Sequence, residues 1–248
     1  MIDQTLIIII GCCAIFVAGF VSGLTGSGYA LISVPVLILM ISPKIVVPVI
    51  LILSVFLNIY VLIEARRWID IKRIYPLMIA GVAGMPFGTH LLKVLNVEVL
   101  KVFIGLVIVL FALAFFRGFR KEIKNEKIAF APVGFASGLL NGATAMSGPP
   151  VILFFTNQGV PRQVFRANAV AYFLVLNLIT LPYLALNGLI TKVVINYSLY
   201  FLPFMTISAF IGIRLSHRIK EDNFRKIVLL LVTFAGIASV LSGLGIIN

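Results

Sequence analysis

Charged residues are scarce in this sequence, and acidic ones are the scarcest. Charged side chains make up 11% of the 248 residues, and only eight of them are Asp or Glu, whereas a soluble domain carries about 25% charge. Hydrophobic residues reach 61%, more than a soluble fold of this length can hide from water. The composition excludes a soluble enzyme, a disordered tail and a disulfide-stapled secreted module, and it predicts a polytopic membrane protein.

Cysteine and buried acid are also missing where catalytic chemistry would need them. The two cysteines, Cys12 and Cys13, are neighbours in an apolar run, which favours neither a disulfide nor a zinc site. All eight carboxylates fall near the ends of apolar runs or between them, so no acidic pair lies at the middle of the membrane. No nucleotide-binding loop or hydrolase motif is present. We therefore predict no enzyme activity, no catalytic residues, no metal site and no cofactor.

The apolar runs divide the chain into two halves of similar plan. The polar segment Arg117–Lys127 is the predicted cytoplasmic linker between a first half, residues 1–116, and a second half, residues 128–248. Each half opens with one long interrupted run and continues with three further runs that can each span a membrane. The predicted runs are 5–41, 45–64, 74–92 and 99–116, then 128–157, 167–187, 197–216 and 223–243.

The two halves also share short stretches of sequence. GFVSGL at 19–24 matches GFASGL at 134–139, a shift of 115 positions. Further along, 88–101 aligns with 212–225 at a shift of 124. These matches predict an internal duplication, which in membrane proteins is typical of transporters.

Basic residues distinguish two membrane topologies. If each interrupted run crosses the membrane once, the 20 Lys and Arg residues divide 10 to 10 between the two sides. If each run is a hairpin that returns to its starting side, they divide 16 to 4, with only Lys44, Lys93, Lys101 and Lys192 on the poorer side. The positive-inside rule favours the hairpins. We therefore predict an all-α membrane protein of two inverted repeats of about five segments each, with both termini outside the cytoplasm. It has eight full spans, or ten segments when the two broken hairpins are counted.

Small and polar residues gather at the two interruptions, Thr25–Gly28 and 141–148. Backbone that leaves a helix at membrane depth must line a cavity or be buried in protein, and half-helix N-termini there suit an anion. At a shift of 115, Pro35 falls on Pro150, and we expect Pro35, Pro149 and Pro150 to prevent a helix through the return segments. Four further glycines follow small-xxx-small spacing and are predicted to pack helices: Gly19, Gly23, Gly134 and Gly138.

The candidate substrate-binding residues combine the interruptions with two asparagines and one arginine. Asn58 and Asn177 lie in the middle of equivalent runs, where they line the pathway or bond a neighbouring helix. Arg166 opens a run and either draws anions or anchors the helix at the cytoplasmic surface. The complete set is Thr25, Gly26, Ser27, Gly28, Asn58, Asn141, Gly142, Thr144, Ser147, Arg166 and Asn177.

At the repeated block the chain resembles the sulfite exporter TauE/SafE family. The resemblance lies in GFVSGLTGSG at 19–28, GFASGLLNG at 134–142, the proline positions, Phe165-Arg166 and the Gly84-x-Pro86-x-Gly88 step. It implies a carrier of the prokaryotic cytoplasmic membrane that exports sulfite or an organosulfonate such as sulfoacetate. The first interruption departs from the family, because Thr25–Gly28 stands where members often carry a run of glycines.

We predict a multi-pass secondary transporter that exports a small sulfur-containing anion by alternating access. The alternatives are an anion channel and a membrane packing or assembly subunit without transport. The expected partners are the anionic sulfur compound and membrane lipid, with no nucleic acid, and a homodimer is a candidate assembly.

Overall fold

The structure is a computed structural model that describes residues 4–116, 126–216 and 222–246, and every described secondary-structure element is helical. The helices are α1 (Gln4–Thr25), α2 (Tyr29–Leu37), α3 (Pro43–Ala65), η1 (Arg66–Trp68), α4 (Ile71–Val94), α5 (Val97–Phe116), α6 (Glu126–Thr144), α7 (Gly148–Asn157), α8 (Arg162–Leu186), α9 (Lys192–Leu215) and α10 (Asp222–Gly243). Six described spans are long and apolar enough to cross a membrane, namely α1, α3 with η1, α4, α5, α8 and α9. The chain is therefore an all-helical membrane protein.

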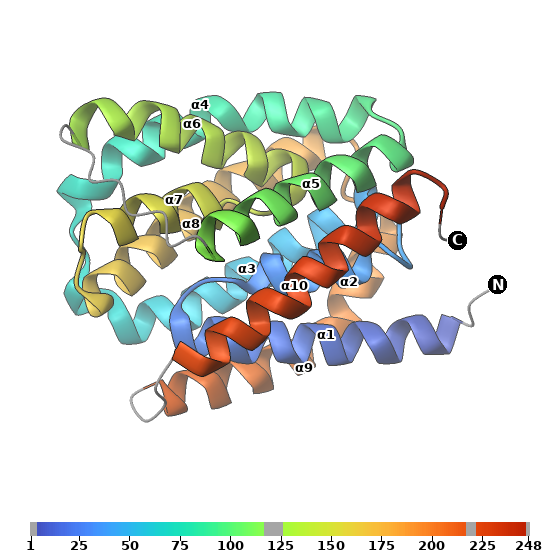
Figure 1. Ribbon diagram of the computed structural model, residues 1–248, viewed down its shortest axis with the longest axis horizontal. Coiled ribbons are helices and arrows are strands. Elements are labelled where there is room, and N and C mark those ends of the chain that lie inside the picture. Colours follow the sequence, from blue (N-terminus) through green and yellow to red (C-terminus); the bar gives the residue numbers. More distant parts are fainter. Residues whose placement is uncertain (1–3, 117–125, 217–221, 247–248) are drawn as a thin grey trace.

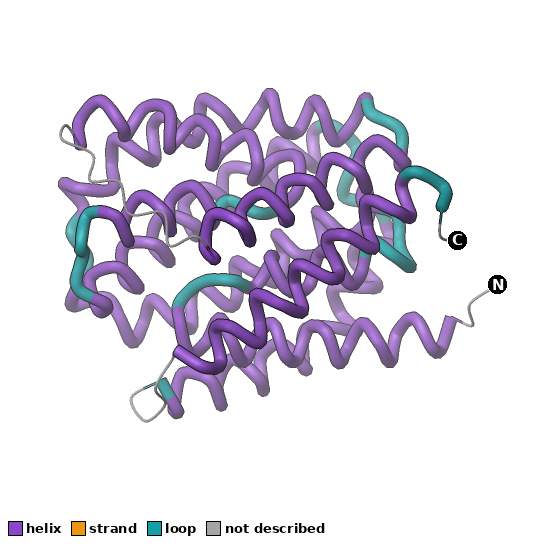
Figure 2. Tube along the Cα trace, viewed as in Figure 1, coloured by secondary structure: helices purple, strands orange, loops and turns teal. Residues whose placement is uncertain are grey.

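Each half begins with a long helix, a break and a short helix that turns back. The first break, residues 26–28, separates α1 from α2, and the second break, residues 145–147, separates α6 from α7. Figure 2 shows both breaks as loops inside the helical body, away from the loops at its ends. The interrupted runs are thus hairpins. Of the predicted linker, residues 117–125 lie outside the described residues, and α6 already begins at Glu126.

The expectation that proline prevents a helix in the return segments is wrong. Pro149 and Pro150 lie in the first turn of α7, where a missing N–H costs nothing because the helix has no acceptor for it. Pro35 lies inside α2, close to its end at Leu37, so the lost hydrogen bond affects only the last turn. The prolines are therefore accommodated in short return helices.

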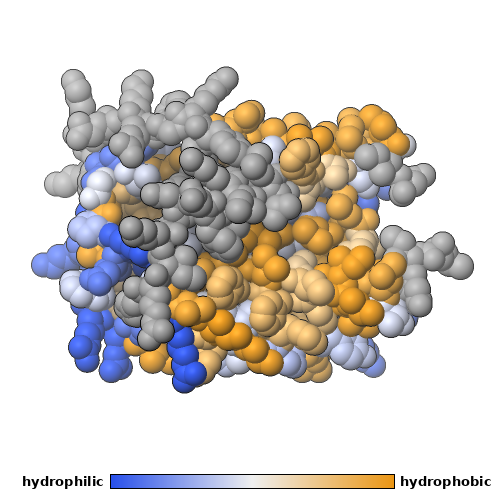
Figure 3. All heavy atoms as spheres, turned by 60° about the horizontal axis from the view of Figure 1, so that its bottom comes forward, coloured by the Kyte–Doolittle hydropathy of each residue, from blue (hydrophilic) through white to orange (hydrophobic). Residues whose placement is uncertain are grey.

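Side-chain hydrogen bonds show which loops share an end of the bundle. Lys93 Nζ donates to the Asn187 side-chain oxygen over 3.2 Å, and Lys44 Nζ donates to the Lys93 carbonyl over 2.9 Å. At the opposite end, Arg162 donates to the carbonyl of Ser216 over 3.3 Å. The described start of α1 and end of α10 lie at the lysine end (Figure 1). Hydrophilic side chains cluster at the arginine end, and apolar ones cover much of the middle (Figure 3).

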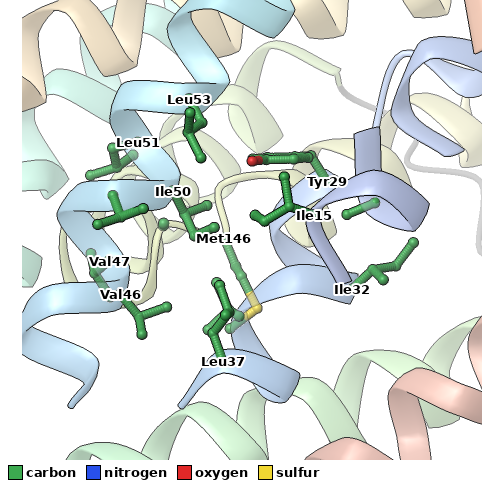
Figure 4. Close-up of a cluster of buried hydrophobic side chains, with 14 of the residues drawn as sticks. Ile15, Tyr29, Ile32, Leu37, Val46, Val47, Ile50, Leu51, Leu53 and Met146 are labelled. Atoms are coloured by element: carbon green, nitrogen blue, oxygen red, sulfur yellow. The ribbon is translucent and has the colours of Figure 1, made fainter. Parts of the chain in front are cut away.

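The helices pack in pairs that join the two halves. Contacts are densest between α4 and α6, α1 and α9, and α5 and α10, while α3 packs against α8 near the middle. In Figure 1 the pair α4–α6 lies along one edge and the pair α1–α9 along the other. The short helix α2 is apolar on all sides, as expected of a buried helix, and Leu37 packs with Ile15, Val46 and Ile50 in the core (Figure 4).

Glycines bring the paired helices into backbone contact. A Cβ atom on Gly23 would lie 2.6 Å from the carbonyl oxygen of Ala209 in α9, and one on Gly142 would lie 2.5 Å from that of Met85 in α4. A Cβ on Gly19, Gly134 or Gly138 would likewise meet neighbouring backbone or side-chain atoms closely. The prediction that Gly19, Gly23, Gly134 and Gly138 pack helices is confirmed.

The same contacts correct the alignment of the two halves. Gly23 and Gly142 make equivalent contacts and lie 119 positions apart, as do Thr25 and Thr144 at the ends of α1 and α6. The shift of 115 positions taken from the sequence match is therefore four residues, or about one helical turn, too short. The cause is the small-xxx-small spacing itself, because glycines repeated every four residues match equally well after a shift of one turn.

Candidate functional site

The two breaks meet at one small cavity in the interior, which we call the central cavity. Its volume is about 40 Å³, room for roughly three water-sized groups. Residues 26–28 and 145–147 line it from the breaks, and Ser54 and Phe173 line it from α3 and α8. Of the predicted site residues, the structure brings six to this cavity: Gly26, Ser27, Gly28, Asn58, Ser147 and Asn177.

Helix α2 directs its N-terminus at the central cavity. Gly26 and Gly28 have φ of 77° and 91°, a left-handed backbone that glycine adopts without strain, and this turns the chain into α2. The first hydrogen bond of α2 runs from Ile32 N to Gly28 O over 3.2 Å, so the amides of residues 29–31 have no acceptor within the helix. These amides carry the positive end of the helix dipole to residues that line the cavity.

Helix α7 begins at the same cavity but offers fewer donors. Its first turn contains Pro149 and Pro150, which have no N–H, so Gly148 is the first-turn residue with an amide that lines the cavity. Ala145, the counterpart of Gly26, also has a left-handed backbone, with φ of 60°. The backbone donors for an anion are therefore concentrated on α2, and the second break contributes chiefly shape and the Ser147 side chain.

Two buried asparagines form the polar wall of the central cavity. Asn58 of α3 is 5% exposed, Asn177 of α8 is 3% exposed, and both line the cavity. Within the described part of the chain, the side-chain oxygen of Asn177 has no hydrogen-bond partner. An unsatisfied amide oxygen in a membrane interior is costly, so a polar ligand in the cavity that donates to it would be stabilised.

Tyr29, the first residue of α2, is a cavity residue that sequence reasoning missed. It is 4% exposed, and its hydroxyl finds no partner among the described residues. Figure 4 shows its ring beside Ile15, with the hydroxyl oxygen pointing toward α3. The available signal in the sequence was a phenol hydroxyl directly after Gly28, in a return segment whose one other polar side chain is Ser33.

Thr25 and Thr144 do not line the central cavity, because each uses its hydroxyl to shape a break. Thr144 Oγ1 lies 2.7 Å from Leu140 O, to which it donates, and it accepts from Met146 N over 3.2 Å. Thr25 Oγ1 lies 3.0 Å from Val21 O and accepts from Ser27 N over 3.2 Å. Both threonines thus satisfy a backbone amide just after the helix end.

Replacing Thr144 with valine is expected to lower the stability of the protein rather than its anion affinity. The change removes the hydroxyl that accepts from Met146 N and leaves a buried amide unpaired, at a cost of about 1–3 kcal/mol. Thermal unfolding of the purified variant in detergent measures this cost. Serine at 144 keeps the hydroxyl and is expected to restore most of the stability. An unchanged unfolding temperature with weakened anion binding would instead place the hydroxyl on the ligand.

Three further predicted residues also lie outside the central cavity. Asn141 is fully buried and donates through Nδ2 to Thr180 Oγ1 over 3.0 Å. Gly142 packs against Met85 and Thr89 of α4, where no ligand can enter. Arg166 lines a neighbouring cavity, is 7% exposed and pairs with Glu64, so it is not an exposed surface anchor.

The comparisons with known proteins give one finding. A family model described as sulfite exporter TauE/SafE matches residues 11–239, nearly the whole chain. No curated protein and no solved structure matches the chain.

Proposed function

Since the chain belongs to the sulfite exporter TauE/SafE family of membrane transporters, we propose that it exports sulfite as a secondary carrier and binds it in the central cavity. One observation carries the proposal. The two breaks, the N-terminus of α2 and both mid-helix asparagines line the same cavity. Broken helices with N-termini at the membrane interior are how inverted-repeat transporters bind anions.

The chemistry of the cavity suits an oxyanion. Sulfite presents several acceptor oxygens, and the cavity presents the amides of residues 29–31 and the serines Ser27 and Ser147. The buried hydroxyl of Tyr29, another lining residue, has no partner among the described residues and can donate to an ion there. Among the residues that the structure describes, no Lys or Arg lines the cavity, so hydrogen bonds and the dipole of α2 would hold the ion. Binding of this kind permits release, which a carrier needs.

The size of the central cavity favours sulfite over an organosulfonate. Sulfite is a single sulfur with its oxygens, and a cavity of about 40 Å³ fits a solute of that size. Sulfoacetate adds a carboxymethyl group and therefore needs more space than the sulfite ion. Inorganic sulfite is therefore the substrate that we propose.

Alternating access would follow from an inverted duplication of residues 1–116 and 128–248. Equivalent pairs at a shift of 119 support it: Thr25 with Thr144, and Asn58 with Asn177. The hydrogen bond from Lys93 to Asn187 also supports it, because those residues lie on opposite sides if each interrupted run crosses once. With the arginine end in the cytoplasm, both termini face outward across the prokaryotic cytoplasmic membrane.

The test of this function is sulfite binding and flux with purified protein. We expect saturable binding of sulfite in detergent, weaker binding of sulfoacetate and sulfate, and exchange of radiolabelled sulfite across proteoliposomes. Conductance without exchange would identify an anion channel. Absence of both binding and flux would identify a packing subunit and overturn the proposal.

Replacing Tyr29 with phenylalanine is expected to weaken sulfite binding about tenfold. The change removes one hydroxyl whose hydrogen bond to an anion contributes roughly 1.5–3 kcal/mol, less the cost of an unsatisfied donor in the empty state. Isothermal titration with sulfite measures the effect. Tyr60→Phe is the matched control, because Tyr60 is exposed on α3 away from the cavity. Equal affinities for the two variants would remove Tyr29 from the site.

A further inference from the structure

A second, larger cavity lies at the arginine end of the bundle, and we call it the vestibule. Its volume is about 190 Å³. It is enclosed by the ends of α1, α3 and η1, the start of α8 and the residue after α9. The lining residues are Leu24, Glu64, Ala65, Trp68, Arg162, Gln163, Arg166 and Ser216. Both halves of the chain therefore supply polar groups to it.

The side chain of Arg166 lies between the vestibule and the central cavity. It donates through one nitrogen to Gly23 O over 2.8 Å and through another to the Glu64 carboxylate. Its Cγ is so close to Gly26 that a Cβ there would collide with it. Because Gly26 lines the central cavity and Arg166 lines the vestibule, the contact between these two residues joins the walls of the two cavities.

Glu64 occupies the face of Arg166 that an incoming anion would use. The Arg166 side chain is 9% exposed and the Glu64 side chain is 30% exposed, so solvent reaches the pair from the carboxylate side. Arg162 lies one turn before Arg166 on the same face of α8 and lines the same cavity. Two guanidinium groups one turn apart match the oxygens of a doubly charged oxyanion.

We propose that the vestibule is a second binding site for a small divalent oxyanion, which displaces the Glu64 carboxylate from Arg166 and is held by Arg166 and Arg162. The inference rests on the proposed function, since it makes the vestibule the loading site for the transported sulfite. Glu64 is then a built-in competitor. It neutralises a buried arginine while the vestibule holds no anion, and it releases that arginine when one arrives.

The single tryptophan of the chain, Trp68, lines the vestibule, so its fluorescence reports on this site alone. The experiment titrates purified protein with sodium sulfite, with a free tryptophan derivative as the control for direct quenching. Replacing Glu64 with glutamine removes the competing charge and is expected to lower the half-saturating concentration about tenfold. Arg162→Gln is expected to raise it about tenfold. If the glutamine variant does not fold, Glu64→Asp takes its place. Aspartate keeps the charge on a shorter side chain, so we expect a smaller decrease in the half-saturating concentration.

A variant of the central cavity separates the two proposals. In Asn177→Leu, which is expected to lose transport, the Trp68 titration should keep the wild-type midpoint. A Trp68 response that disappears in Asn177→Leu, a wild type without any saturable response, or equal midpoints in wild type and Glu64→Gln would overturn the vestibule site. Absence of sulfite flux in the wild type would overturn the proposed function instead.

Discussion

Replacing Gly138 with leucine is expected to destabilise the fold by about 3 kcal/mol or more. Gly138 lies where α6 meets α4, and a Cβ at this position would overlap the carbonyl group of Gly81. Three glycines on each helix allow this approach: Gly81, Gly84 and Gly88 on α4, and Gly134, Gly138 and Gly142 on α6. Lipid supplies no hydrophobic force between helices, so close packing is what holds the pair together.

The matched control is Ala136→Leu, because Ala136 lies on the exposed face of the same helix. Thermal unfolding in detergent and the yield of monodisperse protein measure both variants. We expect Gly138→Leu to unfold far below the wild type or to fail purification, and Ala136→Leu to behave as the wild type does. Equal stability of the two variants would contradict the packing of α4 against α6.

Most of the helical plan could be predicted because each membrane span needs a long apolar run. The predicted run 45–64 corresponds to α3, and 99–116 corresponds to α5. The start of α8 could not be predicted from hydropathy. This helix begins at Arg162, five residues before the predicted run, because its first turns pair Arg162 and Arg166 with groups on other helices.

The alignment of the halves shows a different limit of sequence reasoning. A glycine repeated every four residues fits a neighbouring helix in more than one register. Shared residues alone therefore could not distinguish a shift of 115 positions between the halves from a shift of 119. The contacts of Gly23 with Ala209 and of Gly142 with Met85 separate them. The register in which two glycine-rich helices correspond therefore depends on the partner helix of each.

For the candidate site, the sequence indicated the places where the backbone breaks better than the role of each side chain. Six of eleven predicted residues line the central cavity. Thr25 and Thr144 were chosen for hydroxyls that the structure uses inside the turns, a role that depends on backbone geometry. Tyr29 was missed because it lies in an apolar segment, and Glu64 was missed because it lies at the end of an apolar run. Only the fold brings Tyr29 to the central cavity and Glu64 to the vestibule.

Replacing Asn177 with leucine is expected to abolish sulfite transport and to lower the affinity of the central cavity for sulfite by at least about 100-fold. Leucine removes the amide and extends an apolar side chain into a cavity of about 40 Å³. The same substitution is expected to leave the free energy of unfolding unchanged or to raise it. The Asn177 side-chain oxygen has no partner within the described part of the chain, and replacing an unsatisfied buried amide by an apolar group is neutral or stabilising.

The pair of measurements distinguishes a binding residue from a structural one. A buried asparagine that only joins helices would cost stability when replaced and would leave affinity intact in the protein that folds. A ligand-binding asparagine would cost affinity while the unfolding temperature stays level or rises. Asn187→Leu is the control, since Asn187 pairs with Lys93 at the lysine end, far along α8 from the cavity. A destabilised Asn177→Leu that still transports sulfite as the wild type does would contradict the central cavity as the transport site.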